Sequence, residues 1–142
     1  MREEKIQIAS ENYKNRGFSC SQAVFSAYAE DLGIDQETAF RLMQGFSAGI
    51  AGTQGICGAF SAAVMVISYY MSGKGMDNST KPVNFKAIRT AAELFKEEYG
   101  SIICREILRG DSPKALMCAE KITDAVRIIE TILDKQQNQM QE

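Results

Sequence analysis

The sequence contains no histidine among its 142 residues. Histidine is the commonest general base and the commonest metal ligand in proteins, so the usual residue for both roles is absent. Catalysis by Ser-His-Asp or Cys-His groups is therefore excluded. Four cysteines are present instead, at positions Cys20, Cys57, Cys104 and Cys118. If the protein catalyses a reaction, these thiols are the best candidates for its reactive groups.

The chain also lacks a long hydrophobic run and a strong excess of charge. Its longest apolar segment, 59–71, is interrupted by two serines and is shorter than the ~20 residues of a membrane span. The N-terminus is charged, unlike a signal peptide, and the net charge is only -2. We expect a cytoplasmic protein without membrane insertion or a nucleic-acid partner. Thiols are reduced in that compartment, which favours redox or metal-binding cysteines over structural disulfides.

The hydrophobic spacing is helical almost throughout, and no run alternates with a period of two, so no sheet is predicted. Short connections favour an all-α fold, a compact antiparallel bundle of about six to seven helices. We expect one four-cysteine domain over residues 1–142, with a frayed tail at 135–142. The predicted helices cover residues 2–16, 19–32, 35–44, 56–72, 82–99, 101–108 and 112–134.

Local signals set several of these helix boundaries. Ser19 and Asp35 are predicted N-cap residues, because their side chains can accept hydrogen bonds from free N–H groups. Ser112 and Pro113 form a cap and first-turn pair for the last helix. Segment 73–81, which is rich in turn residues, is the one predicted long loop.

The cysteines are expected to face the bundle core, because each shares an apolar stripe with aliphatic neighbours. Free cysteine packs well as a small hydrophobe, so inert core residues are one interpretation. Their position along the helices favours another. Cys20, Cys57 and Cys104 fall in predicted first turns, and Cys118 falls in a second turn. Helix N-termini favour a thiolate, and helix starts that meet would form a pocket for anionic sulfur.

A glycine-rich segment, 45–58, leads directly into the helix that starts near Cys57. Such a segment lets the backbone approach a ligand or a second sulfur closely. The alternative is that small residues only allow tight packing of helices. The segment lacks the Lys-Ser/Thr of a phosphate-binding loop and the preceding strand of a dinucleotide fingerprint.

The segment Cys57-Gly58-Ala59-Phe60-Ser61-Ala62 resembles the CGAxxG core of a family of putative redox-active proteins. That family is named for its C_GCAxxG_C_C pattern, and Cys20, Cys104 and Cys118 match its three further cysteines. The resemblance covers about residues 10–133. It departs at Ala62, where the motif has its last glycine. The resemblance implies a helical fold and a thiol redox role.

Three functions remain open from the sequence. The first is reversible cysteine oxidation, in which Cys57 is the reactive thiolate and Cys20, Cys104 or Cys118 resolves the product. It requires no cofactor, and its partner is a redox protein or a disulfide substrate. Without histidine, a cation such as Arg105 or Lys114 would assist the helix start.

The second function is a site for zinc or an iron–sulfur cluster with Cys20, Cys57, Cys104 and Cys118 as its four ligands. Their wide spacing differs from that of zinc knuckles, which use close pairs. The third is a non-catalytic helical interaction domain with inert core cysteines. The apolar helix predicted at 56–72 would also suit a homodimer.

Overall fold

The computed structural model describes residues 2–141, with side chains described up to residue 136. Seven helices of six or more residues occupy this part of the chain, together with a single isolated β-bridge, which confirms the all-α prediction. The helices are α1 (Arg2–Asn15), α2 (Cys20–Tyr28), α3 (Gln36–Met43), α5 (Gly58–Met71), α6 (Lys81–Tyr99), α7 (Cys104–Arg109) and α8 (Cys118–Gln141). A 3₁₀ turn, η1 (Gln44–Phe46), and a short turn of helix, α4 (Ser47–Ile50), lead from α3 towards α5.

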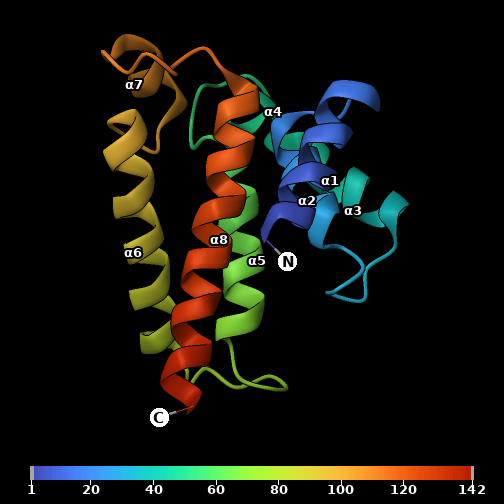
Figure 1. Cartoon of the computed structure of the whole chain (residues 1–142), viewed down its shortest axis with the longest axis vertical. Coiled ribbons are helices and arrows are strands. Elements are labelled where there is room, and N and C mark those ends of the chain that lie inside the picture. The colour runs from blue at the N-terminus through green and yellow to red at the C-terminus, as the bar shows by residue number, and fades with distance from the viewer. Residues whose placement is uncertain (1, 142) are drawn as a thin grey trace.

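The helices α5, α6 and α8 lie side by side. On the side away from α6, α1 and α2 pack against this group, and α3 packs on α2 (Figure 1). The α6 helix runs against the direction of α5 and α8. The starts of α5 and α8 therefore lie at one end of the bundle, together with α4 and α7 (Figure 1). The loop between α5 and α6 lies at the other end.

The core is built from the apolar faces that the sequence predicted. In α8 the stripe of Ile122, Ala125, Ile129 and Ile132 is buried. An aromatic stack lies beside it, with ring centroids 5.3 Å apart for Phe60 and Phe95 and 4.6 Å apart for Phe95 and Tyr99. Edge and tilted ring contacts of this kind add to the stabilisation from burial.

The predicted N-caps of the second and third helices are confirmed. The backbone N–H of Gln22 donates to the Ser19 hydroxyl at 3.4 Å, and the backbone N–H of Ser19 donates to the Gln22 side chain at 3.0 Å. This reciprocal capping box fixes the start of α2 next to Cys20. Asp35 accepts from the Thr38 N–H at 2.6 Å.

The start of the last helix was predicted wrongly. It begins at Cys118, and residues 113–116 form turns. The Ser112 hydroxyl donates to the Glu98 carbonyl at 2.9 Å, so it joins this segment to the end of α6 instead of capping a helix. The helix also continues to Gln141, beyond the predicted end near Asp134. The second helix is shorter than predicted and ends at Tyr28.

Within the described residues, no helix combines the length and the apolar character that crossing a bilayer would require.

Candidate functional site

All four cysteines lie at helix starts, and all four are free thiols. Cys20, Cys104 and Cys118 are the first residues of α2, α7 and α8, and Cys57 is the N-cap residue of α5. The later start of α8 moves Cys118 from a predicted second turn to the first. Cys57 is buried, with 5% of its surface exposed, and the other three are partly exposed.

Two of these thiols share the N-terminus of α5. The backbone N–H groups of Ala59 and Phe60 face the Cys57 sulfur. The same N–H of Ala59 also faces the Cys20 sulfur, as does the N–H of Ser21. A free N–H group at a helix start stabilises negative charge on sulfur. One helix terminus can therefore stabilise a thiolate on either Cys20 or Cys57.

Gly58 allows the starts of α2 and α5 to lie this close together. A Cβ atom at Gly58 would lie 3.1 Å from the Cys20 sulfur and 2.8 Å from the carbonyl oxygen of Phe46. Both distances are shorter than ordinary van der Waals contact. The glycine of the Cys57-Gly58-Ala59 motif is thus explained by the sulfur of a cysteine in another helix.

Cys104 and Cys57 lie diagonally across the isolated antiparallel bridge that pairs Ile56 with Ile103. The Cys57 N–H donates to the Ile102 carbonyl at 2.8 Å, and the Cys104 N–H donates to the Gly55 carbonyl at 2.7 Å. Successive residues of an extended segment point to opposite sides. Because Cys57 and Cys104 each follow a bridge residue, they lie on the same side of the bridge.

The glycine-rich segment packs against Cys104. A Cβ atom at Gly49 would lie 2.9 Å from the Cys104 Cβ. Three neighbouring residues that carry side chains adopt the left-handed conformation, with φ of 54° at Ala48, 64° at Ile50 and 52° at Ala51. Each such residue is strained by roughly 1–2 kcal/mol. The predicted close approach of this segment is confirmed at Gly49 and Gly58.

Cys118 lies between Tyr13 of α1 and Cys20. The charge of Cys118 is the main cause of a raised Tyr13 pKa, followed by burial and by a hydrogen bond between the two side chains. Burial, followed by the charges of Cys57 and Cys118, raises the pKa of Cys20 to about 12. Charge interactions thus link Cys118 to Cys20, Cys20 to Cys57 and Cys57 to Cys104.

Burial also determines the resting state of Cys57. It raises the pKa of the thiol, although the N–H groups of Phe60 and Ala59 and the charge of Lys121 act in the opposite direction. Both Cys57 and Cys20 are consequently protonated at neutral pH. We expected the helix start to give Cys57 a low pKa, and this prediction is wrong. Burial raises the pKa by more than the N–H groups at the helix start lower it.

The two cations suggested by the sequence are engaged elsewhere. The Lys114 ammonium bonds to Glu98 at 2.9 Å and to Asp124 at 3.1 Å, and the Arg105 guanidinium reaches the Thr53 carbonyl at 3.5 Å. Lys121, which acts on Cys57, was missed. Its position next to Ile122 of the apolar α8 stripe was the signal in the sequence that could have revealed it.

A metal site is not favoured by the side-chain positions. Among the residues that the structure describes, no three cysteine, aspartate or glutamate side chains come close enough together to hold a metal ion. The four thiols form a series of neighbours and not a preformed cage.

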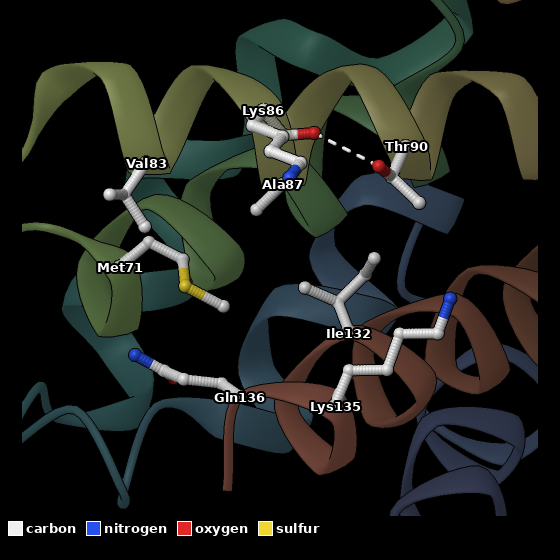
Figure 2. A pocket seen from close by; sticks show the side chains of 8 residues that line it. All are labelled: Met71, Val83, Lys86, Ala87, Thr90, Ile132, Lys135 and Gln136. Atoms are coloured by element: carbon white, nitrogen blue, oxygen red, sulfur yellow. Dashed lines mark hydrogen bonds between the residues drawn. The ribbon is translucent and has the colours of Figure 1, made fainter. Parts of the chain in front are cut away.

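A separate pocket of about 240 Å³ lies away from the thiols (Figure 2). It is formed by the end of α5, the first half of α6 and the C-terminal half of α8. Met71, Val83, Ala87 and Ile132 form its apolar lining, and Lys86 and Lys135 are basic residues beside them (Figure 2). None of its lining residues is a cysteine, so the thiol chemistry is not located there.

Comparison with known proteins gives one match. The model of a family described as "Putative redox-active protein (C_GCAxxG_C_C)" matches residues 18–132, which include all four cysteines. No curated protein and no solved structure matches the chain.

Proposed function

Because the chain belongs to the C_GCAxxG_C_C family of redox-active proteins, we propose that it carries out reversible thiol–disulfide exchange. Its substrate class is a disulfide, either of a small thiol or of a partner protein. One observation carries the proposal: the Cys20 sulfur lies 3.1 Å from the position that a Cβ atom at Gly58 would take, so it lies against the start of α5, where Cys57 is the N-cap residue. These two thiols are the pair that becomes oxidised.

Exchange with the substrate begins at Cys118. This thiol is partly exposed, and it lies at the first residue of the longest helix, beside the Tyr13 hydroxyl. Its thiolate attacks one sulfur of the substrate disulfide, and the other sulfur leaves as a thiolate. A mixed disulfide between Cys118 and the substrate results.

The disulfide then moves inward in two steps. Cys20 loses its proton and attacks the Cys118 sulfur, which releases the second substrate thiolate and leaves a Cys20–Cys118 disulfide. Cys57 loses its proton and attacks the Cys20 sulfur, and Cys118 leaves as a thiolate. In total, one substrate disulfide gains two electrons, and the thiols of Cys20 and Cys57 lose two electrons and two protons.

The start of α5 supports these steps by stabilising negative charge that forms only during exchange. At rest, both buried thiols are neutral because burial raises their pKa. When either sulfur becomes a thiolate, the backbone N–H of Ala59 favours the negative charge, because it lowers the pKa of both thiols. Donors fixed in this way need no reorganisation when the charge develops.

Disulfide mapping tests the proposal. Reduced protein is treated with oxidised glutathione at pH 7.5, quenched with acid and mapped by mass spectrometry. We expect an intramolecular Cys20–Cys57 disulfide as the stable product. The Cys118→Ser variant should form it at least about tenfold more slowly, as expected when the attacking thiol is lost.

The Cys57→Ser and Cys104→Ser variants provide the comparison. Without Cys57, the disulfide should stop at Cys20–Cys118 or at the mixed disulfide with glutathione. Without Cys104, the Cys20–Cys57 disulfide should still form. Protein whose four thiols stay reduced, or that forms only disulfides between molecules, would overturn the proposal.

A further inference from the structure

We infer that Lys121 is a positioning cation that stabilises the Cys57 sulfur while it carries negative charge during exchange. This inference rests on the proposed function and adds a residue to it. Lys121 lies in the first turn of α8, three positions after Cys118. No cysteine motif includes it, and it lies on the apolar side of its helix.

The burial of Lys121 is unusual for a lysine. Only 6% of its surface is exposed, and its ammonium donates to the Ala115 carbonyl at 2.5 Å. Within the described residues, no carboxylate lies at ion-pair distance from this ammonium, whereas Lys5 and Lys96 each have one and Lys114 has two. A buried ammonium without an anionic partner is unfavourable for folding. Stability alone therefore does not explain this lysine.

The carboxylate one turn further along the helix is already engaged. Asp124, three residues after Lys121, accepts from the Tyr99 hydroxyl at 2.7 Å and from Lys114 at 3.1 Å. It also forms an ion pair with Arg127 at 3.3 Å. Its negative charge is thus compensated by other groups. The Lys121 ammonium has three N–H donors. Among the described residues, its one hydrogen-bond acceptor is the Ala115 carbonyl, so two donors are left for other groups.

The groups that act on Cys57 come from each helix packed around it. They are Cys20 of α2, Tyr99 of α6, Cys104 of α7 and Lys121 of α8. Lys121 is the cation in this group, and the other three lose a proton to become anions. Burial raises the pKa of Cys57, and the N–H groups of Phe60 and Ala59 and then the Lys121 charge oppose that rise.

The ammonium contributes charge and not a proton to the reaction. When Cys57 attacks Cys20, its thiol proton leaves to solvent, and the Lys121 charge stabilises the thiolate that remains. In the reverse direction, Cys57 is the leaving thiolate, and the same charge stabilises it. Lys121 is neither oxidised nor reduced.

The test compares Lys121→Met with wild type. Alkylation of Cys57 by iodoacetamide is followed from pH 6 to 10 by mass spectrometry of its peptide in the reduced, full-length chain. We expect the rate profile to shift by about one pH unit to higher pH, and Cys20–Cys57 formation at pH 7.5 to slow about tenfold. Lys121→Arg, which keeps the charge, should restore most of the rate.

Lys114→Met is the matched control, because it removes a neighbouring cation that is bound to Glu98 and Asp124. It should leave the Cys57 profile unchanged. Lys121→Gln is a second variant, which keeps a donor for the Ala115 carbonyl and removes the charge. It should shift the profile as Lys121→Met does, and it replaces Lys121→Met if that variant fails to fold.

The outcomes separate this inference from the proposed function. If the neutral variants keep the wild-type profile and still form the Cys20–Cys57 disulfide, the role of Lys121 is overturned and the exchange function stands. If wild-type protein forms no such disulfide, the proposed function fails. A shift in both Lys121→Met and Lys114→Met would also overturn the inference, because it would indicate a general effect of charge.

Discussion

The Cys20 sulfur packs against Gly58, only 3.1 Å from the position that a Cβ atom there would take. This relationship joins the start of α2 to the start of α5. It gives the central glycine of the cysteine motif a physical role, which is to leave room for a thiol of another helix. The relationship also makes the site sensitive to the addition of a single methyl group.

Gly58→Ala should destabilise the protein by about 1–3 kcal/mol, as overpacking of a buried contact does. The new methyl group would press on the Cys20 sulfur and on the Phe46 carbonyl, which is backbone and cannot turn aside. Urea unfolding of reduced protein measures the loss. Gly45→Ala is the matched control, since its Cβ would meet nothing within 4 Å. An equal effect of both substitutions would contradict this reading of Gly58.

Alkaline pH should destabilise the reduced protein through Cys20. Burial, with the charges of Cys57 and Cys118, raises its folded-state pKa from 9.0 to about 12. The unfolded chain therefore loses this proton at lower pH than the folded chain. The stabilisation is complete below pH 9 and is lost as the pH rises towards 12, by about 1 kcal/mol per pH unit.

Urea unfolding at pH 7.5 and pH 10.5, with reductant present, checks this dependence in wild type and Cys20→Ala. Wild type should lose more stability between the two pH values than the variant does. Cys57, Tyr28 and Tyr99 also have raised pKa values, chiefly through burial, and they contribute equally to both proteins. Parallel losses in the two proteins would show that Cys20 ionises normally.

The fold could be predicted from the sequence because its signals are local. Apolar spacing identified the helices, and the side chains of Ser19 and Asp35 placed two helix starts correctly. The start of α8 failed because Ser112 has the residue type of a cap but uses its hydroxyl to reach the Glu98 carbonyl. That contact depends on the packing of α6 and cannot be deduced from a cap-like pair of residues.

The sequence was sufficient to identify the cysteines of the candidate site but not to predict their pKa values. The spacing and the motif identified the cysteines and their helix starts. The ionisation of Cys57 could not be deduced, because it depends on a balance between burial and the N–H groups of Ala59 and Phe60. Lys121 was overlooked because a charged side chain is usually solvated, although its place beside Ile122 of the apolar α8 stripe pointed to burial.

Tyr99→Phe should destabilise the protein by about 1–3 kcal/mol, because hydrogen bonds to charged groups contribute about that much. Tyr99 is 1% exposed, and its hydroxyl donates to the buried Asp124 carboxylate at 2.7 Å. Urea unfolding at pH 7.5 measures the change. Tyr69→Phe, at a residue that is 57% exposed, is the control and should stay within about 0.5 kcal/mol of wild type. A Tyr99→Phe protein as stable as the control would show that this hydrogen bond is dispensable.

Tyr13→Phe should make Cys118 a slower nucleophile while the fold is retained. The charge of Cys118, then burial and the hydrogen bond between the two side chains, raise the Tyr13 pKa, which places the phenol hydroxyl beside the sulfur. The hydroxyl can donate to that sulfur once it is negative. Losing a donor worth about 1 kcal/mol should slow Cys118 alkylation at pH 7.5 about fivefold.

The measurement is iodoacetamide labelling of the Cys118 peptide, with the Cys104 peptide of the same sample as an internal control. Tyr13 lies on α1, away from the bridge that holds Cys104, so Cys104 should react at its wild-type rate. The exchange of disulfide with glutathione should slow by the same factor as the labelling, because both begin with attack by the Cys118 thiolate. If labelling slows and exchange does not, the substrate disulfide is attacked first by a thiol other than Cys118.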